Sequence, residues 1–146
     1  MTAYDASNVF AKILRGELPC TKLYEDAQTL ALMDIMPRCP GHCLVIPKAP
    51  ERNIFDASPE SLAACMRTAQ MLSHAVMKAF DAQGVTLQQF NEPAGGQVVF
   101  HLHFHVLPRH DGVALGRHTG TMEKREVLKA NADRIIAALT QALALG

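Results

Sequence analysis

The strict alternation of histidine and apolar residues between positions 101 and 107 constrains the fold more than any other feature. Histidines stand at positions 101, 103 and 105, and Leu102, Phe104 and Val106 follow them in turn. Side chains of a β-strand point alternately to the two faces of its sheet. We therefore predict a strand over residues 97–107 that buries the apolar side chains and gathers the three histidines on one surface.

The periodicity of the other segments predicts one α+β domain over residues 1–146. Ser58-Pro59-Glu60 is typical of a helix start, because it combines a capping hydroxyl, a proline and an acidic residue in the first turn. Apolar residues then recur at helical spacing up to Gly84, which predicts the longest helix. Shorter helices are predicted from Ser7 to Gly16 and over residues 124–143. A mostly antiparallel five-stranded sheet is predicted from strands over residues 20–25, 29–34, 43–46, 85–90 and 97–107.

The composition argues against several classes of protein. The 146 residues are 49% hydrophobic, enough for a buried core without disulfide or metal support. The 14 basic residues balance the 14 acidic ones, so overall charge does not favour binding to a nucleic acid. No apolar run reaches about 18 residues and no signal-peptide pattern opens the chain, which predicts no membrane span and a cytoplasmic location. The four cysteines form no Cys-x-x-Cys pair and are predicted to be free thiols.

Histidines in this arrangement fit three roles. An exposed polar face is the simplest, but perfect alternation of three among only seven histidines disfavours it. Neutral imidazoles two residues apart can share a zinc ion with a carboxylate or a cysteine. They can instead perform covalent catalysis, in which one imidazole attacks while its neighbours fix its tautomer, bind an anion and supply a proton. Spacing alone does not decide between the metal site and catalysis.

The loop before the histidines favours phosphate chemistry. Asn91 and Gln97 flank the Gly95-Gly96 pair, which places amide donors and exposed main-chain N–H groups beside the histidine segment. Such donors suit an oxyanion better than a cation. Each of these residues is also common in ordinary turns, so it is their position beside the histidines that supports this interpretation.

The run His101-Leu-His-Phe-His-Val-Leu107 has the pattern His-φ-His-φ-His-φ-φ, where φ is apolar. It resembles the signature of the histidine triad superfamily, in particular its Hint-like and prokaryotic branch. The resemblance implies the α+β fold of that family and a homodimer whose contacts involve the long helix and the strand before the triad. Further family-like blocks follow in family order within residues 8–109, namely residues 8–19, 24–26, 34–35, 41–48 and 96–101.

The resemblance implies a role for each of four histidines. His103 would attack the α-phosphorus of a nucleotide and form a nucleotidyl-histidine intermediate, from which water releases a nucleoside monophosphate. His105 would contact the phosphate and handle protons, and His42 would orient or polarise His103. His101 would fix the His103 ring through its backbone carbonyl. An unperturbed imidazole pKa near about 6.5 supplies a neutral nucleophile at cellular pH without a metal.

The resemblance also implies contacts to the phosphate and the nucleoside. Asn91 and Gln97, together with His105, would hold the phosphate and the leaving-group side. An apolar slot with an acid on the ribose would hold the nucleoside, and it maps to Phe10, Ile13, Leu32, Asp34 and Ile35. Plain helix packing explains Phe10 and Ile13 equally well, and a turn acid at a strand end explains Asp34.

Two departures from the family pattern bear on the leaving group and on metal content. Val98 stands where the eukaryotic Hint enzymes have a serine thought to serve the leaving group, so the resemblance leaves that preference open. Asn8, Ala11 and Pro50 stand where many prokaryotic relatives have ligands of a structural zinc. We therefore predict no structural zinc and no cofactor.

Three functions fit these residues. The first is a purine nucleoside phosphoramidase, with adenosine as the expected nucleoside. A Fhit-like dinucleoside polyphosphate hydrolase is the alternative within the same chemistry, and a nucleotide-binding regulatory protein with vestigial activity is the alternative from another class. His74, His110 and His118 are predicted to occupy solvated surface positions.

Overall fold

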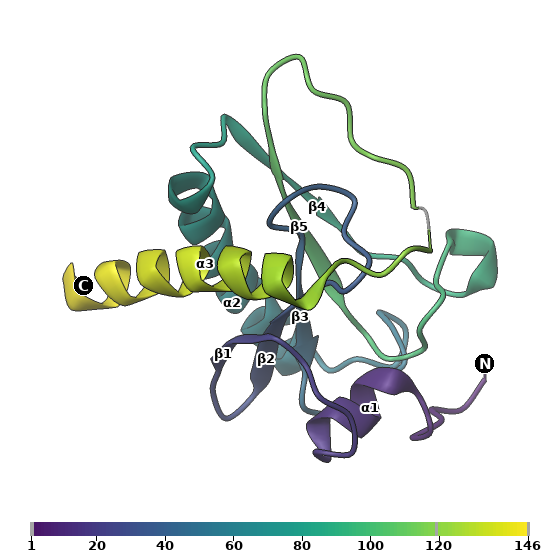
Figure 1. The fold of residues 1–146 in the computed structure, drawn as a ribbon. Helices are drawn as coiled ribbons and strands as arrows, with labels where there is room; N and C mark the ends of the chain where they lie inside the picture. The colour runs from purple at the N-terminus through teal and green to yellow at the C-terminus, as the bar shows by residue number, and fades with distance from the viewer. Residues whose placement is uncertain (1, 119, 146) are drawn as a thin grey trace.

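A five-stranded antiparallel sheet lies at the centre of the molecule (Figure 1). The computed structural model describes residues 2–118 and 120–145, and within them the strands pair in the order β1-β2-β3-β5-β4. The prediction of an α+β fold with a five-stranded sheet and three helices is confirmed. The strands are β1 (Lys22–Glu25), β2 (Thr29–Met33), β3 (Cys43–Pro47), β4 (Gly84–Gln88) and β5 (Phe104–Arg109), and the helices are α1 (Val9–Leu14), α2 (Pro59–Ala79) and α3 (Arg125–Leu145).

Two long helices cover one face of the sheet. α2 begins at the predicted Ser58 cap, whose Oγ accepts a hydrogen bond from Ser61 N at 3.0 Å. α2 and α3 pack against each other and bury their apolar stripes in one cluster with alternate strand residues. Those strand residues include Ala31, Val45 and Val106. This cluster is the larger of the two apolar cores, and it leaves the opposite face of the sheet for other side chains.

The opposite face carries the histidines. Leu44 of β3 pairs with Leu32 of β2 and with His105 of β5, so these three side chains share one face. Phe10 of α1 packs on that face in a smaller apolar cluster that includes Leu32 and Leu44. The short helix therefore covers only part of this face, and the histidine end of β5 lies at the margin of the cluster.

The strand predicted over residues 97–107 is wrong in its first half. β5 begins at Phe104, and residues 97–103 lie outside the sheet. This segment follows the loop after β3 instead, where Leu102 N donates to Glu51 O at 2.8 Å. The other predicted strands differ from the observed ones by at most two residues at either end.

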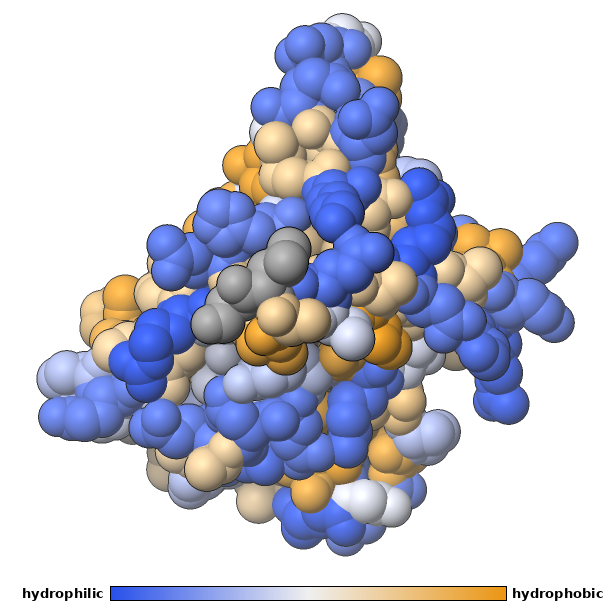
Figure 2. Space-filling model, turned by 90° about the vertical axis from the view of Figure 1, so that its left-hand side faces the viewer, coloured by the Kyte–Doolittle hydropathy of each residue, from blue (hydrophilic) through white to orange (hydrophobic). Residues whose placement is uncertain are grey.

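The next features are the hydropathy of the surface, the length of the helices and the state of the cysteines. Figure 2 shows the side of the molecule that lies to the left in Figure 1, and there apolar side chains are scattered among polar ones. Within the described residues, no helix is long and apolar enough to cross a membrane. All four cysteines are free thiols, as predicted.

Candidate active site

The four histidines singled out from the sequence form one packed cluster. The ring centroids of His103 and His105 are 5.1 Å apart, and those of His42 and His105 are also 5.1 Å apart. His101 is fully buried, and only 9% of His103 is exposed. The cluster is therefore not an exposed polar face that happens to use histidine.

Tyr4, His101 and His103 form a chain of hydrogen bonds that we call the nucleophile relay. His103 Nδ1 lies 2.6 Å from His101 O. A carbonyl oxygen only accepts, so Nδ1 carries the hydrogen and Nε2 keeps its lone pair. The contact expected of the His101 carbonyl is present, and it leaves His103 with one nucleophilic nitrogen.

The His101 ring is fixed in the same way. Its Nε2 donates to Pro47 O at 2.8 Å, and its Nδ1 accepts from Tyr4 Oη at 2.6 Å. The edge of the Phe10 ring packs against His103, with the two centroids 5.0 Å apart. Both rings of the relay thus have a tautomer set by a main-chain carbonyl and a position set by an aromatic neighbour.

Arg38, His42 and His105 form a second chain, which we call the donor relay. Arg38 N donates to His42 Nδ1 at 3.1 Å, so the hydrogen of His42 is on Nε2. His42 Nε2 donates to His105 Nδ1 at 2.9 Å, which leaves the hydrogen of His105 on Nε2. The sequence predicted that His42 acts on His103, whereas the structure directs its hydrogen bond to His105.

Gly41 allows the chain to bring His42 into this relay. Gly41 has φ +90°, and a Cβ there would lie 2.5 Å from Phe80 Cε2. A larger residue is excluded both by this contact and by the left-handed backbone conformation. The close approach to α2 therefore fixes where β3 begins and where the His42 ring enters the opposite face.

Burial keeps these rings neutral. Burial first, and then the positive charges of neighbouring groups, Arg38 among them, lower the pKa of His42 to about 4 and that of His105 to about 3. Burial also lowers the pKa of His103, against the opposing effect of its bond to His101 O. At neutral pH the lone pair on His103 Nε2 is therefore available.

Asp34 lies beside the donor relay. Its Oδ2 is 3.3 Å from His42 Nε2 and 4.0 Å from His105 Nδ1, and its Oδ1 accepts from Met36 N at 2.8 Å. Burial raises the pKa of this carboxyl group. The predicted ribose ligand is thus placed where it also contacts the histidine cluster.

Asp34, His42 and His105 are the described group whose ligand atoms lie close enough together to hold a metal ion. Two imidazole nitrogens on one tetrahedral zinc, each at about 2.0–2.1 Å, would lie roughly 3.3 Å apart. His42 Nε2 and His105 Nδ1 are 2.9 Å apart, which is a hydrogen-bond distance. This spacing favours a shared proton. Asn8, one of the positions that the resemblance mapped to a zinc ligand, caps α1 by accepting from Ala11 N at 2.9 Å, so it rather than Ser7 begins the helix.

The Gln97 amide is occupied within the protein. Only 4% of Gln97 is exposed, and its Oε1 accepts from Glu92 N and Asn53 Nδ2 at 2.8 and 3.0 Å. Its Nε2 donates to Arg52 O at 2.8 Å and to Val99 O at 3.1 Å. In this structure Gln97 therefore organises two loops, and a direct bond to phosphate requires one of these bonds to open.

The rest of the loop before the histidines is similarly self-contained. Asn91 Oδ1 accepts from Ile54 N at 2.8 Å, and its Nδ2 donates to Gln89 Oε1 at 2.8 Å. The expectation of exposed N–H groups at Gly95 and Gly96 is wrong, because the 3₁₀ turn at Pro93–Gly95 uses them. Gly95 N donates to Glu92 O at 2.9 Å and Gly96 N to Pro93 O at 3.0 Å.

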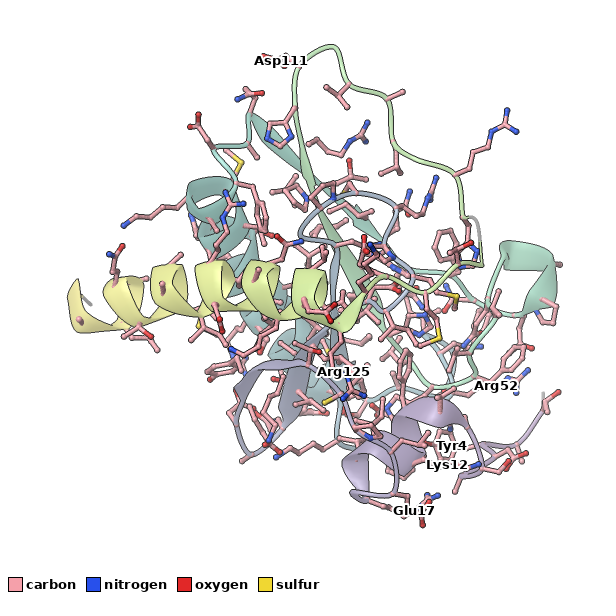
Figure 3. All side chains as sticks on the ribbon, in the orientation of Figure 1. Tyr4, Lys12, Glu17, Arg52, Asp111 and Arg125 are labelled. Atoms are coloured by element: carbon pink, nitrogen blue, oxygen red, sulfur yellow. The ribbon has the colours of Figure 1, made fainter. Side chains whose placement is uncertain are left out.

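Sequence reasoning missed the ion pair that holds this loop. Arg52 donates from Nε and Nη2 to the two carboxylate oxygens of Glu92 at 2.8 and 2.9 Å, and stacks on Phe100 with its Cζ 4.1 Å from the ring centroid. The bonds from Arg52, together with one from Asn53 Nδ2, lower the pKa of Glu92 to about 2, and the backbone of Glu92 has φ 64°. Figure 3 shows Arg52 and Tyr4 on the same side of the molecule. Neither residue belongs to a local pattern that would reveal its long-range partner.

The residues predicted to hold the nucleoside are only partly brought together. Phe10 and Leu32 are buried in the small cluster against which Ile13 packs, while Ile35 is 42% exposed near Asp34. A hollow of about 420 Å³ lies beside Ile13 and is lined by residues of α1, β1 and β2 and by Lys48. None of the four histidines lines it, so we do not assign the nucleoside to that hollow.

Comparison with known proteins identifies the family. The model of the HIT domain matches residues 15–112. The chain belongs to the HIT domain family. It is 38% identical over 122 residues to the adenylylsulfatase HINT3 of Arabidopsis thaliana, a match that spans 80% of this chain and 62% of that protein. It is 39% identical over 103 residues to the adenosine 5'-monophosphoramidase hnt1 of Schizosaccharomyces pombe, covering 70% and 74% of the two chains.

Solved structures of HIT proteins share the fold. A Hit-like protein of Bartonella henselae has a TM-score of 0.88 and 48% identity, with 93% of this chain and 99% of that chain covered. A zinc-bound histidine triad protein of Mycobacterium smegmatis has a TM-score of 0.87 and 31% identity, with 96% and 98% covered. Membership in this family identifies the chain as a nucleotide-binding hydrolase at the level of class.

Proposed function

We propose that this HIT protein hydrolyses a purine nucleoside phosphoramidate through a covalent intermediate on His103. The observation that supports this most is the pair of opposite tautomers: His103 presents a lone pair and His105 presents a hydrogen. A nucleophile needs the first and a leaving amine needs the second. The named phosphoramidase of fission yeast adds support for an amine leaving group.

The reaction has two steps. His103 Nε2 attacks the α-phosphorus, an N–P bond forms, and the bond from phosphorus to the leaving nitrogen breaks with its electron pair passing to that nitrogen. His105 Nε2 donates a proton to the same nitrogen. Water then attacks phosphorus and gives a proton to His105 Nε2. The bond from phosphorus to His103 Nε2 breaks, its electron pair returns to that nitrogen, and a nucleoside monophosphate is released.

Asp34 fits the protonated stage of this cycle. The anionic substrate raises the proton affinity of His105, so the ring takes up a second proton before it gives one away. The second proton comes from solvent and lies on His105 Nδ1, where it displaces the hydrogen bond from His42 Nε2. The His42 hydrogen can then turn to Asp34 Oδ2 at 3.3 Å, and the same oxygen lies 4.0 Å from His105 Nδ1, close enough to stabilise its positive charge. The carboxylate therefore balances the charge of the donor relay when the substrate is bound.

The test is brief exposure to adenosine 5'-phosphoramidate followed by mass spectrometry under mildly alkaline conditions. We expect an acid-labile adenylyl adduct on His103, and none in His103→Ala. An adduct elsewhere, or turnover by His103→Ala at the wild-type rate, would overturn the assignment. If nucleotide binds while the wild-type protein shows neither adduct nor turnover, the chain is a nucleotide-binding regulatory protein instead.

A second candidate substrate is adenosine 5'-phosphosulfate, favoured by the named adenylylsulfatase among the relatives. The same attack by His103 would then release sulfate, which needs less proton donation than an amine because sulfate is a weak base. Comparison of kcat/KM for the two substrates and for a diadenosine polyphosphate decides between them. A much faster diadenosine polyphosphate would overturn both.

The exposed edge of the sheet supports a homodimer. β4 is an end strand, and 44% of Leu87 in it is exposed. Unpaired strand edges offer main-chain donors and acceptors to another chain. Sedimentation should give twice the 15.9 kDa of one chain, and a value for a single chain would contradict the dimer.

A further inference from the structure

The segment after β5 lies against the turn that carries Asp34 and His42. In Figure 1 residues 110–118 arc away from the end of β5, and residues 120–124 lead into the start of α3. Gly116 N donates to Arg38 O at 3.1 Å, and farther along Glu123 N donates to Ile35 O at 2.8 Å. A Cβ on Gly116 would lie 2.5 Å from Arg38 O, so the contact requires a glycine. The segment therefore forms one wall beside the donor relay.

Arg38 contributes a fixed cation to this wall. Its Nε donates to Gly116 O at 2.9 Å, and its Nη1 lies 3.4 Å from Gln88 Oε1. Gln88 stands directly opposite His105 in the β4–β5 pair, so the guanidinium is held over the His105 end of the sheet. Among residues 2–118 and 120–145, no carboxylate forms an ion pair with it. Its remaining N–H groups are available to a ligand.

His118 brings a second basic group to the same place. It follows Gly116 by two residues and is exposed. The main-chain bond of Gly116 to Arg38 O brings this part of the segment to the turn before β3. A positive charge on His118 adds to the lowering of the His42 and His105 pKa values and opposes the rise that burial causes in the pKa of Asp34. Arg38 acts on His42 and His105 in the same way. Two basic residues from distant segments thus belong to the same wall beside the donor relay.

We propose that Arg38 and His118 form a subsite for a second tetrahedral oxyanion of the nucleotide substrate, a sulfate or a phosphate in addition to the α-phosphate. This rests on the proposed function of the site. A guanidinium binds such a group through two parallel N–H bonds, and the rest of its donors here are already oriented by Gly116. An uncharged amine leaving group would not use this subsite.

The oxyanion has two possible positions in a nucleotide. It can belong to the leaving group, as in adenosine 5'-phosphosulfate, or to the ribose, as in a 3'-phosphorylated nucleotide. The recognition chemistry is the same in both cases. Substrates that carry the extra anion at one position or the other distinguish them.

The experiment measures kcat/KM at low salt for three substrates: adenosine 5'-phosphoramidate, its 3'-phosphorylated form, and adenosine 5'-phosphosulfate. The quantity compared is the kcat/KM of each substrate that carries the extra anion, divided by the kcat/KM of adenosine 5'-phosphoramidate. We expect Arg38→Gln and His118→Asn each to lower one of these ratios by about tenfold, and Arg38→Lys to restore part of the loss. Arg67→Gln, which removes a cation from α2 on the other side of the sheet, should leave both ratios unchanged.

The outcomes separate the subsite from the proposed function. A lower ratio for the sulfate substrate places the subsite at the leaving group, and a lower ratio for the 3'-phosphate substrate places it at the ribose. Unchanged ratios in both variants, with the wild-type protein active, would overturn the subsite alone. If the wild-type protein turns over none of the three substrates, the proposed function fails instead.

Discussion

The two relays use the same side chain to opposite effect. In the nucleophile relay the inner nitrogen of His103 faces a main-chain carbonyl, so the outer nitrogen is left with a lone pair. In the donor relay the chain begins at a main-chain N–H, so after two imidazoles the outer nitrogen of His105 is left with a hydrogen. The difference teaches that the sequence pattern His-x-His-x-His does not itself assign roles; the backbone group behind each ring does.

The relays also differ in charge. Tyr4, His101 and His103 have no carboxylate or guanidinium hydrogen-bonded to their ring atoms among the described residues. The donor relay has Asp34 on one side and the basic groups Arg38 and His118 on the other. Substrate charge and pH should therefore act mainly through the donor relay.

Removal of the nucleophile should have the largest effect. His103→Ala should lower kcat by about 10⁴-fold, because no other lone pair is aimed at phosphorus, while the affinity for AMP changes far less. Single-turnover kinetics and calorimetry of AMP binding measure the two quantities. Equal losses of both would mean that His103 only binds.

Removal of the donor should depend on the leaving group. His105→Ala should lower kcat by about 10²- to 10⁴-fold for an alkyl phosphoramidate. With a p-nitrophenyl ester of AMP the loss should be much smaller, since that group leaves without a proton. His103→Ala is the matched control, because its loss should be large with either leaving group.

Removal of the His42 imidazole should weaken the donor relay, because it deletes the hydrogen bond that orients His105. His42→Gln is expected to lower kcat by about 10- to 100-fold.

The same variant tests how the stability of the protein depends on pH. The folded pKa of His42, about 4, lies below its ordinary value of 6.5, so protonation favours the unfolded chain. The free energy of unfolding should be constant above about pH 6.5 and fall as the pH drops toward about 4. Urea melts should show a weaker fall for His42→Gln. An identical pH dependence of the free energy of unfolding in the wild-type protein and in His42→Gln would contradict the lowered pKa of His42.

Tyr4→Phe should have a smaller effect. It deletes one hydrogen bond to His101 Nδ1, but Pro47 O still fixes the tautomer. We expect kcat to fall by less than about tenfold. A loss as large as that of His103→Ala would show that the phenol acts in the chemistry.

Removal of metal should have no effect. The 2.9 Å separation of His42 Nε2 and His105 Nδ1 suits a proton, so dialysis against a chelator should leave kcat unchanged and elemental analysis should find no zinc. One zinc per chain would make the donor relay a metal site and would remove the contrast between the two relays.

The sequence predicted the fold well where local patterns decide it. Ser58-Pro59 marks the start of α2, and the strands predicted over residues 29–34 and 43–46 correspond to β2 and β3, because capping and strand-forming composition act within a few residues. The strand predicted from the alternation of residues 101–107 was wrong over residues 97–103, since Leu102 in this segment bonds to the loop after β3 and not to a neighbouring strand. Here the histidines of that segment are buried as well as Leu102, and the alternation does not record what the backbone pairs with.

The sequence indicated which residues lie together at the site better than it indicated which hydrogen bonds join them. The four histidines and Asp34 do lie together, but the hydrogen bond of His42 goes to His105 and not to His103, and the Gln97 amide predicted to hold phosphate is bonded within the protein. Tyr4 and Arg52 were missed. Tyr4 meets His101 across 97 positions, and no spacing rule reaches that far.

Three of the groups that assign the proton positions are main-chain atoms: Pro47 O, His101 O and Arg38 N. A side-chain substitution does not delete a main-chain atom, so most point mutations nearby leave the proton positions of His103 and His105 unchanged. The side chains that line the substrate site can be replaced more freely. A protein built this way can change the substrates it accepts over many generations while its reaction stays the same.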